Sequence, residues 1–256
     1  MWRTVVSVAA IEEGIAERRF GPVQVNVIAS APDYPALNNV LGAAEEGAVK
    51  GGNLEKAIAW ADSFGVDYRV SVARDLPEMA AAESLLDHLG FEQGQGVVKY
   101  VRDTSPPDFP GVKGARVWEI GDDAGLAGET MSLSAAPAIG MPNQAWDLLF
   151  SLPVQEHWHS FTVEFRGNIV AFGSLLVNDG VAELGLDGTL GYARGHGCNL
   201  ALLRQRILAA REAGCHTIFA ESIIGPEEGI ATAGRNLVRA GFIPACHSMY
   251  WQRPRL

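Results

Sequence analysis

Residues Leu186 to Ala213, LDGTLGYARGHGCNLALLRQRILAAREA, decide the fold. The stretch reads as the end of a strand, a tight turn rich in glycine, and then a helix. The turn spans Arg194 to Asn199, and the glycines within it permit backbone angles and a close ligand approach that a Cβ would prevent. The helix carries apolar residues at the spacing of a single buried face, namely Leu200, Leu203, Ile207 and Ala210.

A turn of this kind suits a phosphate group. A helix N-terminus presents free N–H groups and a partial positive charge, and Arg194 adds a cation beside it. Two familiar phosphate loops are excluded, because residue 200 is Leu rather than the last glycine of G-x-G-x-x-G and no Gly-Lys-Ser/Thr follows. An ordinary helix-initiating loop without a ligand is the alternative interpretation.

The pattern that remains, R-G-x-G-x-N between a strand and an amphipathic helix, resembles the pyrophosphate-binding motif of the GNAT superfamily of N-acyltransferases, R/Q-x-x-G-x-G/A. Arg194, Gly195 and Gly197 match that motif. Asn199 departs from it, because Gly or Ala is usual at that position.

The elements around the turn extend the resemblance from Ser160 onwards. We expect strands at 160–177 (two, joined at 166–168), 181–186, 216–222 and 247–252, and a short helix that ends at Gly241. This order is that of the GNAT fold, and R-N-L-x-R-x-G-F before the last strand is similar to the family's closing helix.

The first half repeats part of this pattern. LLDHLGFEQGQGVVKYVR and NLVRAGFIPACHSMYWQR each read as a helix, Gly-Phe, a short break and a strand that leads to an arginine. The expected elements of this half are strands at 3–10, 23–29, 67–73 and 96–101 and helices at 54–64 and 77–89. An unrelated α/β segment is the alternative.

Where the first half should carry a phosphate loop, it has Gly42 to Ala48, GAAEEGA. The adjacent carboxylates Glu45 and Glu46 would repel a pyrophosphate. We therefore predict that the first half is a degenerate GNAT-like domain that binds no coenzyme.

A stretch rich in Pro and Gly, 104–111, marks a domain boundary. The prediction is an α/β (α+β) protein with a tandem GNAT fold, in which two mixed β-sheets are flanked by helices. The domains are 1–104, without a phosphate loop, and 112–256, which binds acetyl-CoA. In the second domain we expect a first strand at 116–120, a loose stretch at 132–142 and a helix at 144–150.

Composition limits the function classes. The chain has 256 residues, an apolar fraction of 48% and a net charge of -10, which argues against a nucleic-acid partner. It has neither an apolar run of bilayer length nor a basic-then-apolar start, so no membrane association is expected. Its cysteines, Cys198, Cys215 and Cys246, suit neither a disulfide framework nor a zinc site, which makes the cytoplasm the expected compartment. A monomer or a homodimer is expected.

The resemblance implies acetyl-CoA as the acyl donor and a small-molecule amine as the acceptor. Backbone N–H groups at Thr189 and Leu190 would then face the pantetheine arm and the thioester carbonyl, and backbone amides of the turn would hold the pyrophosphate. Asn236 would add a hydrogen bond. The residues expected to bind the coenzyme are thus Thr189, Leu190, Arg194, Gly195, His196, Gly197, Cys198, Asn199 and Asn236.

The general acid is where the sequence departs from the family. Many members place a Tyr five residues before the Phe of Gly-Phe, and here that residue is Leu237, which donates no proton. Cys246 and Tyr250 on the last strand are unranked substitutes. A thiolate leaves readily, so a dedicated acid is not essential.

Glu183, before the turn, and Glu221, at the end of the next strand, are the candidate general bases. The alternatives are a solvent-facing strand residue for Glu183 and a surface or helix-capping carboxylate for Glu221. His157 and His159 alternate on a strand, but no carboxylate or Cys pattern completes a metal site, so no metal is expected. An acyl-Cys mechanism at Cys198 is a minor alternative.

Three functions remain open. The first is an N-acetyltransferase that acts on a small amine, such as an amino compound, an antibiotic or a natural product. The second is a non-catalytic protein that binds acyl-CoA or a small molecule for sequestration or self-resistance. The third is another acyl-CoA reaction, such as transfer to a hydroxyl group.

Overall fold

The structure is a computed structural model that describes residues 14–35, 37–121, 125, 130, 157–224 and 232–254. The strand expected at 3–10, the loose stretch at 132–142 and the helix expected at 144–150 lie outside these residues. The chain forms two compact units. Of the described residues, the N-terminal unit contains those from 14 to 98 and from 246 to 254, and the C-terminal unit contains those between 99 and 245.

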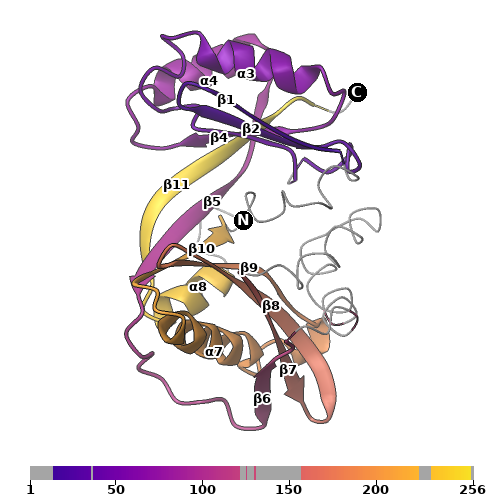
Figure 1. The fold of residues 1–256 in the computed structure, drawn as a ribbon, viewed down its shortest axis with the longest axis vertical. Coiled ribbons are helices and arrows are strands. Elements are labelled where there is room, and N and C mark those ends of the chain that lie inside the picture. The colour runs from indigo at the N-terminus through magenta and orange to yellow at the C-terminus, as the bar shows by residue number, and fades with distance from the viewer. Residues whose placement is uncertain are drawn as a thin grey trace. The chain divides into compact units, whose positions relative to one another are not determined.

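The N-terminal unit is a mixed sheet covered by two helices (Figure 1). Its elements are β1 (Ile15–Phe20), β2 (Val23–Ile28), β3 (Asn39–Leu41), α3 (Asn53–Asp62), β4 (Arg69–Ala73), α4 (Met79–His88) and most of β11 (Ile243–Gln252). The strand order is β1-β2-β3-β4-β11, in which only β3 and β4 run parallel.

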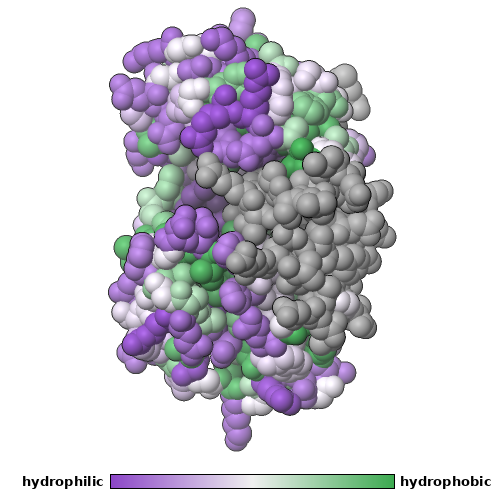
Figure 2. Space-filling view, viewed as in Figure 1, coloured by the Kyte–Doolittle hydropathy of each residue, from purple (hydrophilic) through white to green (hydrophobic). Residues whose placement is uncertain are grey.

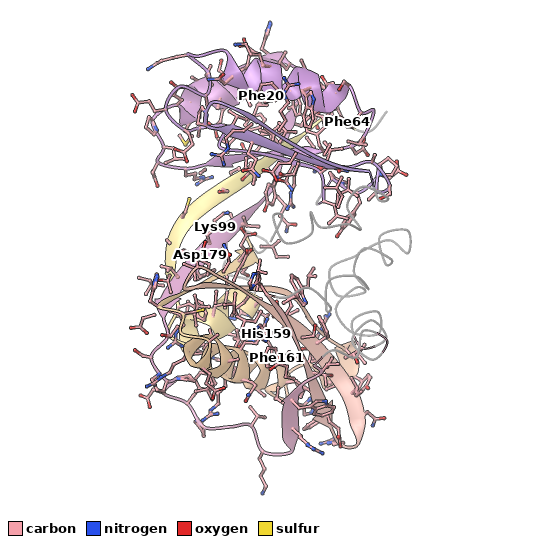
Figure 3. All side chains as sticks on the ribbon, viewed as in Figure 1. Phe20, Phe64, Lys99, His159, Phe161 and Asp179 are labelled. Atoms are coloured by element: carbon pink, nitrogen blue, oxygen red, sulfur yellow. The ribbon has the colours of Figure 1, made fainter. Side chains whose placement is uncertain are left out.

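Apolar periodicity explains how the helices lie on this sheet. The buried face of α3 consists of Leu54, Ala57, Ile58 and Ala61, which is the i, i+3, i+4, i+7 pattern of an amphipathic helix. The ring of Trp60 packs 6.3 Å from Phe20 and 4.8 Å from Phe64 (Figure 3). Hydrophilic side chains cover much of the outer surface over α3 and α4 (Figure 2). The predicted helices at 54–64 and 77–89 and the strands at 23–29 and 67–73 are therefore confirmed.

In the C-terminal unit the strands of the sheet follow the order β5-β10-β9-β8-β7-β6. Its elements are the end of β5 (Glu92–Asp103), β6 (Ala115–Glu119), β7 (Trp158–Phe165), β8 (Asn168–Asn178), β9 (Val181–Thr189), a 3-10 turn at Gly191–Ala193, α7 (Cys198–Glu212), β10 (Thr217–Ile223) and α8 (Thr232–Arg239). The parallel pair is β9 and β10, and α7 packs across β6 to β9.

The hairpin expected at 160–177 is confirmed as β7 and β8. Arg166 (φ +54°) and Gly167 (φ +78°) form a two-residue turn with positive φ at both positions, which matches the right-handed twist of the strands. Both faces of this hairpin are buried: Phe161 and Phe172 are fully buried, and the pairing of Phe172 with Thr162 places them on opposite faces.

The last strand of each helix–strand repeat extends out of its own half of the chain. β11 follows α8, yet Ser248 to Trp251 pair with β4 of the N-terminal unit. β5 follows α4, yet its end lies beside β10 of the C-terminal unit. There the guanidinium of Arg102 donates to the carbonyl oxygen of Ala240 at the end of α8. The division into domains at 1–104 and 112–256 therefore stays a prediction about two halves of the sequence, whereas each compact unit includes a strand from the other half.

The strands that sequence reasoning missed are short or at an edge. β1 carries few buried side chains, and β3 has three residues. Neither gives a clear period-2 pattern. Among the described residues, no helix is long and apolar enough to cross a bilayer.

Candidate functional site

The sheet of the C-terminal unit opens between β9 and β10. The two strands pair in parallel from Val181 opposite Thr217 to Leu184 opposite Ala220, and the pairing then stops although both strands continue. On its other side β9 carries a bulge at Leu186, whose φ is +45°. A bulge bends a strand and increases its twist, which separates β9 from β10 at this point.

A small cavity of about 20 Å³ lies at this opening. The strands β9 and β10 and the helices α7 and α8 contribute to its lining, which consists of Leu184, Asp187, Asn199, Leu203, Arg206, Ala220, Glu221, Ala233 and Leu237. The cavity therefore joins the strand opening to the first turn of α7 and to α8.

The turn of residues 194–197 leads directly into α7. Gly195 (φ +78°) and Gly197 (φ +83°) both have left-handed backbone angles, which favour glycine. Gly197 is the residue that precedes the helix, and no side chain caps the first turn of α7. The N-cap residue thus supplies no side-chain acceptor to the N–H groups of that turn, as an anion-binding helix N-terminus requires.

The side chains of this turn differ in exposure. Arg194 is exposed, and its Nε donates to the carbonyl oxygen of Thr189 (3.1 Å). His196 is also exposed, and its ring lies 5.2 Å from that of Phe165 on β7. Cys198 is buried, and burial raises the pKa of its thiol above the ordinary value. An acyl-Cys mechanism is therefore disfavoured, and Cys198 can serve a ligand only through its backbone N–H.

The two residues expected to donate backbone N–H groups have different environments. The N–H of Leu190 already donates to the carbonyl oxygen of Val170 on β8 (2.9 Å), so it is not free to bind a ligand. Thr189 is paired with Ala171, and its Oγ1 is buried with no hydrogen-bond partner among the described residues. A buried hydroxyl of this kind is a candidate contact for a ligand or for a water.

A buried polar network underlies the turn. The Nη2 atom of Arg206, a fully buried residue, lies 3.3 Å from Oδ2 of Asp187. The amide of Asn199 donates to the same oxygen (3.0 Å) and accepts a hydrogen bond from Nδ2 of Asn236 on α8 (3.0 Å). The structure thus brings together Asn199 and Asn236, which the sequence indicated separately, and adds Asp187 and Arg206.

The two candidate bases lie on one face of the sheet. Glu183 is opposite Phe219 in the β9–β10 ladder, and Glu221 is two residues further along β10, so alternation puts all three on the same side. Glu221 forms an ion pair with Lys99 on β5 (2.9 Å; Lys99 is labelled in Figure 3). The Lys99 ammonium therefore lies beside one of the two candidate bases.

The candidate acids fall in different environments. Leu237 is buried and lines the cavity, so the position at which the family often has Tyr is apolar here. Tyr250 belongs to the N-terminal unit, where the guanidinium of Arg69 lies 3.7 Å above its ring. Cys246 belongs to the same unit and is partly exposed.

The equivalent turn of the N-terminal unit, between β3 and α3, is already occupied. The carboxylate of Glu78 accepts hydrogen bonds from the backbone N–H groups of Gly47 (3.0 Å), Val49 (2.6 Å) and Lys50 (3.2 Å). Burial opposes the ionisation of Glu78, but these donors outweigh it and hold its pKa below the ordinary value. The protein itself therefore supplies an anion to this turn.

The histidines near β7 have ordinary partners. The Nδ1 atom of His159 lies 2.7 Å from Oε1 of Glu119, and Trp158 is buried between His157 and His159. Within the described part of the chain, no three His, Cys, Asp or Glu side chains cluster as metal ligands.

Sequence reasoning missed Asp187, Arg206 and Glu78. Arg206 had a signal, because it lies four residues after Leu202 and three after Leu203, in the middle of the apolar stripe of α7. A charged residue at such a position is buried with a partner or extends out to solvent. Asp187 and Glu78 had no local signal, because their partners are remote in the sequence.

No protein-family profile matches this sequence, and neither does any curated protein. Solved structures do match. A GCN5-related N-acetyltransferase from Kribbella flavida aligns over 98% of this chain and 97% of its own, with a TM-score of 0.70 and 16% identity. One from Sphaerobacter thermophilus aligns over 92% of this chain and 78% of its own, with a TM-score of 0.68 and 16% identity.

A tandem GNAT protein from the clavulanic acid biosynthesis pathway aligns over 91% of this chain and 79% of its own, with a TM-score of 0.55 and 14% identity. These likenesses extend across both units. The chain therefore has the GNAT fold, and the fold class expected from the sequence is confirmed.

Proposed function

We propose that the protein is an acyltransferase that moves an acetyl group from acetyl-CoA to the amine of a small molecule. One observation carries this proposal: the uncapped first turn of α7 lies at the same end of β9 as the bulge and the opening toward β10. An anion-binding helix N-terminus beside a strand opening can hold the phosphates of a coenzyme while its arm enters the sheet.

The chain offers distinct groups to each part of the coenzyme. The turn from Arg194 to Asn199 would hold the pyrophosphate through its backbone N–H groups, with the Arg194 guanidinium beside it. Thr189 would contact the pantetheine arm through its backbone N–H and its unpartnered hydroxyl. Acetyl-CoA supplies an activated acyl group as a thioester.

The acceptor amine must be neutral to attack, so the site needs a carboxylate or a water path. Glu183 and Glu221 remain the proposed bases. The Lys99–Glu221 ion pair lies on the same face of the sheet as Glu183 and would orient the amine. The substitutions Glu183→Gln and Glu221→Gln should each lower kcat, and the two together by about 100-fold.

The N-terminal unit would bind no coenzyme in this scheme, for a reason that differs from the repulsion predicted from Glu45 and Glu46. Its turn already binds the carboxylate of Glu78, which is buried and accepts three backbone hydrogen bonds.

Calorimetry with acetyl-CoA tests the proposal. The sharpest variant pair is Gly195→Asp and Gly195→Asn, because a Cβ at this glycine meets open space and both residues tolerate left-handed angles. They differ only in charge, so Gly195→Asp should lose at least about tenfold more affinity than Gly195→Asn.

Gly214→Asp is a control at another open left-handed glycine, and it should bind acetyl-CoA like the wild type. Equal binding by the Asp and Asn variants at position 195 would remove the turn from the coenzyme site. Failure of the wild type to bind would overturn the proposal.

A second candidate function is kept because the buried Leu237 leaves the position of the resembled family's usual acid without a proton donor. This function is non-catalytic binding of acyl-CoA or a small molecule. Binding of acetyl-CoA without release of free thiol across a panel of amines would select it over acyl transfer.

A further inference from the structure

We infer that Asp187, which the buried guanidinium of Arg206 holds in place, is a positioning residue that fixes Asn199 and with it the first turn of α7. The network itself stands on contacts within the C-terminal unit. Its consequence for the coenzyme rests on the proposed function, because that turn is the proposed pyrophosphate site.

The bulge of β9 places Asp187. Gly185 pairs with Ser174 and Gly188 with Phe172, so Leu186 and Asp187 together oppose the single residue Gly173 on β8. The two-against-one arrangement turns the Asp187 side chain toward α7, where its carboxylate contacts Arg206 and Asn199.

Gly173 provides the room for the cation. A Cβ at this residue would lie 2.9 Å from Cζ of Arg206 and 3.2 Å from Cβ of Asp187. The guanidinium therefore fills the space that a side chain on β8 would take, and its Nη1 donates to the carbonyl oxygen of Ser174 (3.1 Å). A fully buried Arg requires a charged partner. Here the partner is Asp187, and the ion pair holds its carboxylate in one orientation.

Asp187 in turn fixes the amide of Asn199. The Nδ2 atom of Asn199 donates to Oδ2 of Asp187, and its Oδ1 accepts from Asn236, so both ends of the amide are held. A Gly or Ala at residue 199, as is usual in the motif, could make neither bond. Because no side chain caps α7, Asn199 is the residue through which the sheet controls the first turn of this helix.

The variant Asn199→Ala tests this inference, because it breaks both links of the amide and keeps the Arg206–Asp187 ion pair. We expect coenzyme A to bind about tenfold more weakly, as the loss of one oriented hydrogen-bonded group implies. Pantetheine lacks the pyrophosphate, so its affinity should not change. Asp187→Asn should weaken coenzyme A binding in the same way and also lower Tm, because it leaves the Arg206 charge buried without a partner.

A matched control is Thr162→Val. The Thr162 hydroxyl is fully buried on β7 and donates to the carbonyl oxygen of Ala171 (3.1 Å), so this variant also removes one buried hydrogen bond in the same unit. It should lower Tm like Asn199→Ala without any effect on coenzyme A binding. If Thr162→Val weakens coenzyme A binding as much as Asn199→Ala does, Asn199 acts through stability alone and the inference is wrong.

Hydrogen exchange in the free protein gives a readout that needs no ligand. The Ala201 N–H donates to the Gly197 carbonyl oxygen (2.9 Å), which closes the first turn of α7. Asn199→Ala and Asp187→Asn should speed exchange at Ala201 about tenfold relative to Ile207 in the middle of the helix. Unchanged exchange at Ala201 would overturn the inference even if the wild type binds acetyl-CoA. Faster exchange, with a wild type that binds no acyl-CoA, would uphold the network and overturn the proposed function.

Discussion

The turn before α3 and the turn before α7 share a backbone feature but differ in whether a carboxylate of the protein binds to them. Each follows a strand and leads into a helix through a left-handed glycine, Gly52 before α3 and Gly197 before α7, and neither helix has a side-chain cap. In the turn between β3 and α3, called the first turn below, the Glu78 carboxylate accepts hydrogen bonds from three backbone N–H groups. The second turn has no such carboxylate among the described residues, and its neighbouring side chains are Arg194 and His196.

This difference teaches that a glycine-rich turn before a helix is an anion site whose ligand can be internal or external. The N–H groups need an acceptor in either case, and a carboxylate of the protein, an anionic ligand or water can supply it. An internal carboxylate makes the first turn part of the stability of its unit. We propose that the turn before α7 takes its anion from a ligand instead.

The largest expected contrast is in stability. A Cβ at Gly42, in the first turn, would lie 2.5 Å from the backbone oxygen of Pro22, whereas one at Gly195 meets open space. Both glycines have φ of +78°. Gly42→Ala should therefore lower the free energy of unfolding by about 2–5 kcal/mol, from the backbone strain and the clash together. Gly195→Ala should lower it by about 1–2 kcal/mol. Urea unfolding of both variants measures the difference, and equal losses would show that the first turn is no more tightly built than the second.

The second contrast is in pH dependence. The folded-state pKa of Glu78 is lowered, so its ionised form contributes stability above the unfolded-state pKa, and this contribution is lost as pH falls through the folded-state pKa. Glu78→Gln puts an NH2 group against backbone donors, so Tm should fall at neutral pH. The Tm difference from the wild type should shrink on acidification. A difference that stays constant from neutral to acidic pH would mean that Glu78 acts by shape rather than by charge.

The third contrast concerns the exposed cation at the second turn. Arg194→Ala should weaken acetyl-CoA binding by about three- to tenfold at low salt, because a surface charge pair is worth roughly 1 kcal/mol. The loss should be smaller at high salt, since screening weakens such pairs. Calorimetry at two salt concentrations checks this, with Arg211→Ala at the other end of α7 as the control variant. A loss that is independent of salt would assign Arg194 a structural role through its bond to Thr189.

The smallest expected effect is at Cys198. The N–H groups of the first turn bind a side chain of the protein, whereas we expect those of the second turn to bind acetyl-CoA. The Cys198 side chain would not take part, so Cys198→Ala should leave acetyl-CoA affinity within about twofold of the wild type. Its buried thiol should also react slowly with iodoacetamide, because burial raises its pKa. Rapid alkylation of Cys198 that acetyl-CoA blocks would contradict this expectation.

Local sequence patterns were enough for most of the fold. The apolar stripe of Leu54, Ala57, Ile58 and Ala61 marks α3, and the Arg166–Gly167 turn marks the β7–β8 hairpin, because the residues that define each element are neighbours in the chain. β1 and β3 escaped this reasoning because one is largely exposed and the other too short for a periodic pattern.

Only part of the candidate site could be predicted from the sequence. The glycines and Arg194 were visible as a motif, and Asn199 was visible as a departure from it. The reason for that departure, the Asp187 carboxylate held by Arg206, was not visible, because a bulge on β9 and a glycine on β8 together create the position of the carboxylate.

The sequence by itself determined that two helix–strand repeats exist, that each contains a glycine-rich turn before a helix, and that the second resembles a pyrophosphate loop. Only the tertiary structure decided which turn is open. Along the sequence, Glu78 lies 28 to 31 residues from the N–H groups that donate to it, and Asp187 lies 19 residues from Arg206. Turn chemistry and apolar periodicity act between neighbours, whereas buried charges find their partners only when the chain is folded.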